Sequence, residues 1–270
     1  MILALAFPLA RMKLSNTEIQ NFLNDYYVNK LTVKICSQKY NIGKSTALKI
    51  LKKFGTGGRK RDEYDNNKYA CNESFFEKID SHEKAYWFGF ICADGNIYNQ
   101  KLQIALNKKD ENHLLKFCKQ INYNGPIYND RTLKRLMICR KKLVQDLKKL
   151  GIQENKTFLI DQEIFGQVPN QYIRSAILGY IDGDGSFSIK NNGVNFTLVG
   201  NYSFLNFIVS FLRENGISLN EPKKDKRTRQ TYYINKYLSK DNCCKMVDIL
   251  YSEGSSDYLE RKRNKLIYEK

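Results

Sequence analysis

The chain has few histidines, few acidic residues for its number of basic ones, and no long apolar run, and each shortage excludes a class of protein. Its two histidines, His82 and His113, argue against a histidine-rich metal site and against a nuclease that uses a histidine base. We expect both to be structural or solvated. No apolar run reaches the roughly 18 residues of a membrane span, so none is predicted. The longest apolar stretch, residues 2–10, lacks the preceding basic segment of a secretory signal.

The seven cysteines include no CxxC pair, and Cys243 and Cys244 are adjacent. This spacing suits neither a disulfide framework nor a zinc site. We therefore expect reduced thiols that serve as small core residues in an intracellular protein. The hydrophobic content of 42% and the aromatic content of 13% are sufficient for a folded core.

Positive charge is what the chain has in excess. It carries 45 Lys and Arg against 28 Asp and Glu, a formal net charge of +17. An excess of this size favours an anionic partner such as nucleic acid. The excess is shared along the chain, since residues 1–70 hold 13 basic and five acidic side chains.

The N-terminal part, residues 1–54, predicts three short helices, over residues 16–28, 33–40 and 44–54. Small Cys36 in the second helix and Asn41 in a turn that needs a positive φ resemble a helix-turn-helix of the resolvase and transposase type. An ordinary three-helix bundle is the alternative. The basic third helix favours DNA binding, through Lys44, Ser45, Thr46 and Lys49. Residues 1–12 are interpreted either as disordered or as sequence upstream of a start at Met12.

Residues 55–72 predict a basic linker, because glycines and a charge run interrupt the helical pattern. Its cluster of Arg59, Lys60 and Arg61 is interpreted either as a phosphate contact or as a solvated linker.

The remaining chain contains an internal repeat. Residues 85–97 recur as residues 176–187, and the matching aspartates in the two segments, Asp94 and Asp184, lie 90 residues apart. The same order of patterns follows each segment, which predicts a helix-strand-strand-helix-strand-strand-helix unit that occurs twice. Two such units indicate a pseudo-twofold domain.

Each repeat opens with an apolar helix that contains a glycine, Gly89 or Gly179, and ends in Asp-Gly. If the two helices pair through these glycines, Asp94 and Asp184 meet at the end of the interface. Two adjacent carboxylates are costly unless a cation neutralises them, and Mg²⁺ prefers carboxylate, water and phosphate oxygens.

Residues 88–95 (FGFICADG) and 178–185 (LGYIDGDG) resemble the two signature motifs of the LAGLIDADG homing endonucleases. Residues 75–90 resemble the entry into that motif in phage and bacterial members. The resemblance implies an α+β fold: two pseudo-symmetric αββαββα repeats, residues 73–165 and 166–270, form a DNA-binding saddle beside a small all-α helix-turn-helix domain. It also implies a monomer that lays each four-stranded sheet into the major groove of a long, pseudo-symmetric DNA target.

The resemblance further implies the site residues. Asp94 and Asp184 would bind the divalent metal together with the backbone carbonyls of Ala93 and Gly183. Cys92 stands where the second motif has Asp182, so we expect some asymmetry between the halves.

Three further residues match active-site positions of the family. Lys156 and Lys262 match its active-site lysines, although neighbouring arginines leave the register of Lys262 open. Asn107, at the end of the second strand, matches the polar residue that positions water.

DNA reading is expected from alternate strand residues and from the basic run of residues 223–230 in the second repeat. The candidates are Lys101, Gln103, Arg135, Arg140, Ser188, Lys190, Asn195, Lys223, Lys224, Arg227 and Arg229.

The sequence therefore predicts a site-specific, Mg²⁺-dependent endonuclease that cuts both DNA strands and leaves short 3′ overhangs. Mn²⁺ or Ca²⁺ is expected to substitute in the site, Ca²⁺ without cleavage. The expected location is the cytoplasm or nucleoid of a bacterial or phage-infected cell, or an organelle. An RNA maturase and a non-cleaving DNA-binding regulator on the same scaffold are the alternatives.

Overall fold

The structure is a computed structural model that describes residues 14–29, 31–55, 57, 69–154, 156, 159–226, 231–251, 254 and 256–267. The chain divides into two compact units, Met1–Lys68 and Tyr69–Lys270. Residues 69–72 belong to the second unit rather than to the predicted linker, because the backbone N–H groups of Ala70 and Asn72 donate hydrogen bonds (2.7 Å each) to Asn124 and Ile121. Residues 1–12 and the cluster of Arg59, Lys60 and Arg61 lie outside the described residues.

The first unit is formed by three helices, each within one residue of its predicted bounds: α1 (Asn16–Tyr27), α2 (Val33–Lys39) and α3 (Lys44–Phe54). Ser15 and Glu18 cap the start of α1 reciprocally. Cys36 is fully buried in the small core between the helices. Asn41 adopts a φ of 47°, so the turn before α3 has the left-handed residue that the sequence predicts.

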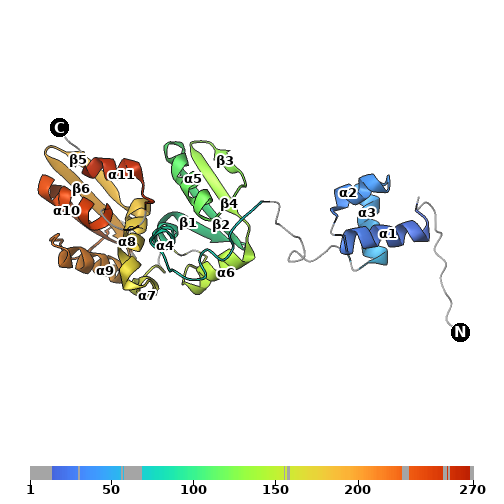
Figure 1. Ribbon diagram of the computed structural model, residues 1–270, viewed down its shortest axis with the longest axis horizontal. Coiled ribbons are helices and arrows are strands. Elements are labelled where there is room, and N and C mark those ends of the chain that lie inside the picture. The colour runs from blue at the N-terminus through green and yellow to red at the C-terminus, as the bar shows by residue number, and fades with distance from the viewer. Residues whose placement is uncertain are drawn as a thin grey trace. The chain divides into compact units, whose positions relative to one another are not determined.

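The second unit contains the predicted repeat, one order of elements occurring twice (Figure 1). The first copy is α4 (His82–Asp94), β1 (Gly95–Tyr98), β2 (Lys101–Asn107), α5 (Glu111–Gln120), β3 (Ile127–Asp130), β4 (Leu133–Ile138) and α6 (Lys141–Lys149). The second is α8 (Asn170–Asp184), β5 (Ser186–Lys190), β6 (Gly193–Gly200), α9 (Tyr202–Glu214), β7 (Lys223–Lys224), β8 (Tyr232–Ser239) and α10 (Lys240–Tyr251). The prediction of a duplicated unit is confirmed.

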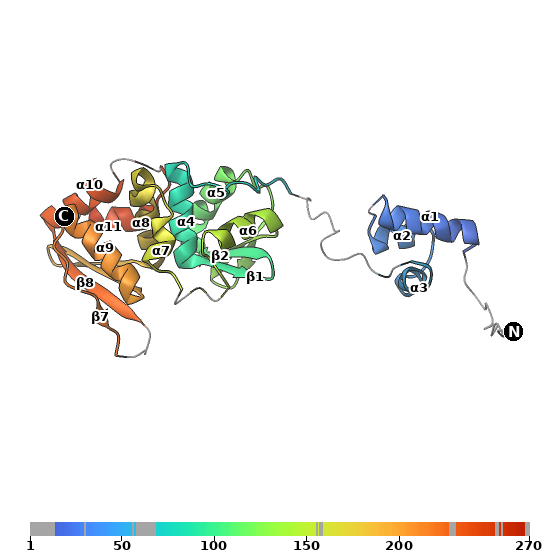
Figure 2. The same ribbon diagram turned by 90° about the horizontal axis from the view of Figure 1, so that it is seen from below.

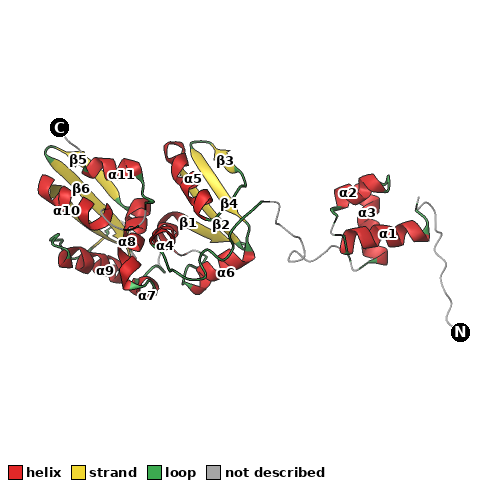
Figure 3. Ribbon diagram, in the orientation of Figure 1, coloured by secondary structure: helices red, strands yellow, loops and turns green. Residues whose placement is uncertain are grey.

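Each copy builds one antiparallel four-stranded sheet, and the strand orders correspond: β1-β2-β4-β3 and β5-β6-β8-β7 (Figure 3). The strands bury alternate residues, as in β2, where Leu102, Ile104 and Leu106 are buried and Lys101 and Gln103 face outward. The buried faces pack on helices of the same copy, with α5 and α6 against β2 and α9 against β6 and β8. In the described part of the chain, the outward residues of β2 on the other face, such as Lys101 and Gln103, are at least partly exposed.

Three short elements were not predicted: a 3-10 turn η2 (Lys108–Asp110), α7 (Gln162–Gly166) and α11 (Glu260–Leu266). Helices α7 and α11 have five and seven residues, which is too short for a hydrophobic period to be recognised in the sequence. Helix α11 also reads as a charged surface segment, yet it buries Lys262 and Leu266.

Helices α4 and α8 lie side by side at the centre of the second unit, and the two views agree on this (Figures 1 and 2). Residues 85–92 of α4 and 175–182 of α8 are all buried, which explains why these segments are apolar all round. None of the helices among the described residues is long and apolar enough to span a membrane.

Candidate functional site

Two glycines allow the backbones of α4 and α8 to touch. A methyl group built on Gly89 would lie 1.9 Å from the carbonyl oxygen of Ala176, and one on Gly179 would lie 2.0 Å from that of Tyr86. A third glycine, Gly183, continues the contact at the helix ends, where its methyl group would lie 2.2 Å from Ala93 Cβ. The close approach predicted from Gly89 and Gly179 is therefore present, and the two Asp-Gly ends lie together.

Asp94 and Asp184 end these helices and interact electrostatically. Burial, followed by repulsion from Asp184, raises the pKa of Asp94 to about 6. The pKa of Asp184 is also raised, because the packed helix ends keep water from part of its carboxylate, although its side chain reaches the surface. The two carboxylates thus share a site that disfavours their joint ionisation.

A buried lysine lies behind each helix end. Lys156 Nζ donates to the carbonyl oxygens of Cys92 (2.7 Å) and Ala93 (2.8 Å). Lys262 Nζ donates to those of Ile181 (3.0 Å), Asp182 (2.5 Å) and Gly183 (2.9 Å). Positive charge at a helix C-terminus is favourable, because the last carbonyls have no partner within the helix.

Of the three neighbouring basic residues 261–263, Lys262 is the one that contacts the helix end. Arg261 turns away to Asp110, and Arg263 lies over the rings of Tyr251 and Tyr258. Burial lowers the pKa of Lys262 to about 8, and burial also lowers the pKa of Lys156. Both ammonium groups hydrogen-bond to carbonyls at the helix ends. From these positions their positive charge lowers the pKa of Asp94 and of Asp184, against the larger effect of burial.

The donor set fits a hard dication. Two carboxylates, joined by the carbonyls of Ala93 and Gly183, offer the oxygen ligands that Mg²⁺ and Ca²⁺ accept. Each of these carbonyls accepts one lysine proton and keeps a second lone pair. A dication would relieve the repulsion that raises the pKa of Asp94. Among the described residues no group of three or more His, Cys, Asp and Glu could hold a metal, so the site depends on this pair and on backbone oxygens.

Asn107 ends β2, as predicted, and its side chain accepts a hydrogen bond from Lys109 N (3.1 Å) at the start of η2. Its role in positioning water stays a prediction. Asn201, which follows β6 in the second repeat, caps α9 by accepting a hydrogen bond from Phe204 N (2.8 Å).

The open face of the first sheet carries most of the predicted DNA contacts of that half. Lys101 and Gln103 face outward from β2, and Gln103 lies between Asn96 of β1 and Met137 of β4. Arg135 lies on the same face and forms an ion pair with Asp130.

Arg140 departs from the prediction. Its side chain is 5% exposed, pairs with Glu73 (3.1 Å) and donates to the carbonyl oxygen of Tyr69. It therefore fixes the segment that enters the second unit instead of facing outward from the sheet. The alternation of β4 was an available signal, because position 140 has the parity of buried Leu136 and Ile138. Its partners could not be predicted, because they precede Arg140 by about 70 positions.

The open face of the second sheet is polar. Ser188, Asn195 and Tyr237 form one row across β5, β6 and β8, and Lys190 is exposed at the end of β5. Lys223 and Lys224 form the exposed edge strand β7. Arg227 and Arg229 lie outside the described residues.

In the first unit, Lys44, Ser45 and Lys49 are exposed on α3, and Thr46 is half-buried. The apolar positions Ala47, Ile50 and Leu51 face the core, so α3 presents a basic outer side.

One series of buried, hydrogen-bonded polar side chains was not predicted. Asp182, fully buried in α8, accepts hydrogen bonds from the Tyr86 hydroxyl (2.9 Å) and from Leu259 N (2.7 Å). The same hydroxyl lies 2.9 Å from His113 Nε2. Cys92, the counterpart of Asp182 in the first motif, is an apolar buried thiol. The sequence signals this asymmetry, because the same motif position holds Cys92 in one repeat and Asp182 in the other. The partners of Asp182 could not be predicted, because they come from distant elements.

No protein-family model matches the chain. A curated relative from Pyrococcus abyssi, one of the subunits of an A-type ATP synthase, is 31% identical over 117 residues. The match covers 40% of this chain and spans 11% of the length of that relative.

The solved structures to which the chain is similar include homing endonucleases. I-DmoI in complex with DNA and Ca is 17% identical, with a TM-score of 0.48 and coverage of 73% of this chain and 100% of that one. I-LtrWI, a LAGLIDADG homing endonuclease bound to target DNA, is 11% identical, with a TM-score of 0.45 and coverage of 73% and 90%. The meganuclease I-SmaMI bound to uncleavable DNA is 13% identical, with a TM-score of 0.43 and coverage of 63% and 85%.

Proposed function

We propose that the chain is a LAGLIDADG homing endonuclease that hydrolyses one phosphodiester bond in each strand of a double-stranded DNA target. The observation that carries the proposal is the pairing of Asp94 and Asp184 at the ends of two helices that touch through glycines, each with a buried lysine behind it. The duplicated site and the duplicated sheets suit a reaction that occurs once on each strand.

Mg²⁺ held by Asp94 and Asp184 would supply Lewis-acid polarisation of the scissile phosphate. The chain supplies the rest. The carboxylates accept hydrogen bonds from water and orient it, and the ammonium groups of Lys156 and Lys262 hold the carbonyls of Ala93 and Gly183 in place. The same ammonium groups offset negative charge that develops on the phosphate, at a site where packed helices weaken screening by water.

DNA binding is proposed for the open faces of both sheets and for the outer side of α3. The sheet faces offer amide, hydroxyl and tyrosine side chains that suit base edges, with lysines that suit phosphates. The first unit would act as a helix-turn-helix that lengthens the footprint and raises affinity through its tether to the second.

The test begins with target selection, because the bases that are read do not follow from the fold. Plasmids with randomised inserts are enriched by binding to the full chain in Ca²⁺, and the enriched plasmids are then incubated with the chain in Mg²⁺ and in EDTA. We expect linear product in Mg²⁺ with short 3′ overhangs, mapped by sequencing the ends, and no linear product in EDTA.

Matched variants separate chemistry from binding. Asp94→Asn and Asp184→Asn should each abolish double-strand cleavage and leave binding in Ca²⁺-free buffer within a few-fold, because the amide keeps the shape of the side chain. Asp80→Asn is the control, since Asp80 is an exposed carboxylate just before α4 that pairs with Lys84. Cutting that survives in both site variants would contradict the proposal. Uncut DNA in Mg²⁺ with tight binding would favour a regulator, and preference for intron RNA would favour a maturase.

A further inference from the structure

The two buried lysines occupy equivalent places, but the segments that carry them are held differently. Residues 257–261, which include the start of α11, precede Lys262 in the sequence. Residues 151–155 precede Lys156. Polar groups of the first repeat contact the former segment at several points, and we name these contacts the cross-repeat clamp: Trp87–Asp257, Gln120–Asp257, Lys116–Glu260 and Asp110–Arg261.

Asp257 forms the buried part of the clamp. Its carboxylate accepts hydrogen bonds from Trp87 Nε1 (2.7 Å) and Gln120 Nε2 (3.0 Å), and both donors belong to the first repeat. Asp257 is 5% exposed and Trp87 is fully buried. Hydrogen bonds to an ionised carboxylate are among the stronger ones in proteins, and neither Asp257 nor Trp87 is exposed enough for water to compete freely.

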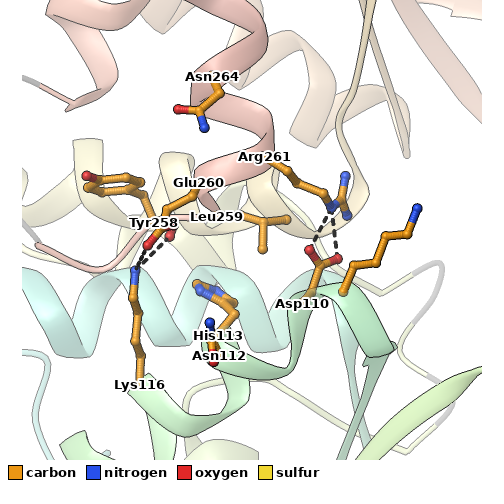
Figure 4. A pocket seen from close by; sticks show the side chains of 10 residues that line it. Asp110, Asn112, His113, Lys116, Tyr258, Leu259, Glu260, Arg261 and Asn264 are labelled. Carbon is orange, nitrogen blue, oxygen red and sulfur yellow. Dashed lines mark hydrogen bonds and ion pairs between the residues drawn. The ribbon is translucent and has the colours of Figure 1, made fainter.

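Asp110 forms the second part, next to Lys262 itself. Arg261 Nε lies 2.9 and 2.8 Å from the two carboxylate oxygens of Asp110, which is 6% exposed (Figure 4). Figure 4 also shows Lys116 of α5 reaching Glu260, at 3.0 Å. The N-terminal end of α11 is thus fastened to η2 and α5 of the other repeat.

In the corresponding segment of the first repeat, the described residues 153 and 154 make their side-chain contacts within their own repeat. Gln153 Nε2 donates to the carbonyl oxygen of Lys148 (3.1 Å), and Lys148 Nζ pairs with Glu154 (3.2 Å). Glu154 and Glu260 both stand two residues before the buried lysine, so the comparison is direct. One is paired within its own repeat and the other across to the opposite repeat.

We propose that Asp257 and Asp110 are positioning residues for Lys262, and that the clamp makes one of the two cleavage events depend on both repeats. The inference rests on the proposed endonuclease function. Because Lys262 holds the carbonyls of residues 181–183, movement of α11 would disturb the helix end that carries Asp184. The DNA strand whose phosphate lies beside Lys262 would then be cut more slowly, and the other strand would not.

The test measures each strand separately. A target duplex labelled on one strand or the other is cut by the full chain, and a supercoiled plasmid with the same target reports nicked and linear product. Asp257→Ala and Asp110→Ala are compared with the wild type, and Glu154→Ala is the matched control. We expect each clamp variant to slow one strand, the same in both, by about 10-fold or more, since small misplacements near reacting groups have effects of that order. The other strand should stay within about twofold, and nicked plasmid should accumulate.

The ratio of the two strand rates does not depend on how much variant protein is folded, because an unfolded molecule cuts neither strand. Equal slowing of both strands in the clamp variants would overturn the inference, as would an unchanged ratio. A skewed ratio in Glu154→Ala as large as in Asp257→Ala would also overturn it. Absence of cutting by the wild-type chain would overturn the proposed function and this inference with it, whereas cutting with an unchanged ratio would overturn the inference alone.

Discussion

The substitution Gly179→Ala tests the helix contact on which the site depends. The added methyl group would lie 2.0 Å from the carbonyl oxygen of Tyr86 and 2.8 Å from Phe90 N, and real Cβ contacts essentially never fall below 3.0 Å. Both obstacles are backbone atoms, so no side chain can rotate away. Helices α4 and α8 would have to separate by about 1 Å at this point, given that required contact distance.

The expected cost follows from two opposing effects. Overpacking of this kind typically costs about 1–3 kcal/mol or more, whereas alanine in place of glycine inside a helix gains at most about 1 kcal/mol. Because both obstacles are backbone atoms, we take the upper end of the overpacking range and expect a net loss of about 2 kcal/mol, which for a domain of this size lowers Tm by roughly 4–8 °C. Cleavage should fall further than stability, by roughly 100-fold, because a 1 Å displacement of Asp184 from Asp94 spoils the geometry of the pair.

The assay is thermal unfolding by circular dichroism, together with cleavage of the selected target at a temperature where both proteins are folded. Gly166→Ala is the matched control, since a methyl group at this helical glycine of α7 would have nothing within 4 Å. That variant should be as stable as the wild type or slightly more so. If Gly179→Ala matched the wild type in both Tm and cleavage, the close helix contact could not be what brings the carboxylates together.

Two further predictions concern pH and salt. Burial, aided by the charge of Lys116, lowers the pKa of His113 to about 3. Below pH 6.5, His113 is therefore protonated in the unfolded chain but remains neutral in the folded chain. The free energy of unfolding should therefore fall with decreasing pH more steeply in the wild type than in His113→Gln, by up to about 1.4 kcal/mol per pH unit between pH 6 and 4; parallel denaturant-unfolding curves would contradict this. DNA affinity should fall linearly on a log–log plot against salt, and Lys101→Ala should reduce the slope by about 1 if this exposed lysine contacts a phosphate.

The duplicated architecture could be predicted because its signals are local and occur twice. Strand alternation in residues 101–107 and 186–190 and the helical spacing of residues 44–54 each follow from a few neighbouring side chains. The pairing of the glycines could be predicted because a helix buried all round must lie against another element. The chemistry of the paired helix ends was inferred from the resemblance of residues 88–95 and 178–185 to a known motif. Spacing alone cannot distinguish a metal site from a helix cap.

Residues whose surroundings come from distant parts of the chain escaped prediction. Arg140 follows β4 with the parity of the buried residues Leu136 and Ile138, and the partner that fixes it, the carbonyl oxygen of Tyr69, lies far away in the sequence. The hydrogen bonds of Lys156 and Lys262 were not predicted either, because their acceptors are carbonyls some 60 and 80 residues earlier. A lysine in a charged segment gives no local sign that it will be buried, because the four unpaired carbonyls that attract it belong to another helix.

The difference between Cys92 and Asp182 explains how one fold can hold two unequal halves. A carboxylate at a fully buried helix position is tolerated only where donors reach it, and at position 182 Tyr86 and Leu259 supply them. Leu259 lies inside the segment that the first repeat clamps, so the acid and the clamp support each other. At position 92 a thiol needs no donor, and the segment before Lys156 is accordingly free to make its contacts within its own repeat. In the arrangement that we propose, Asp182 adds to the contacts of Asp257 and Asp110 that make the position of Lys262 depend on the first repeat.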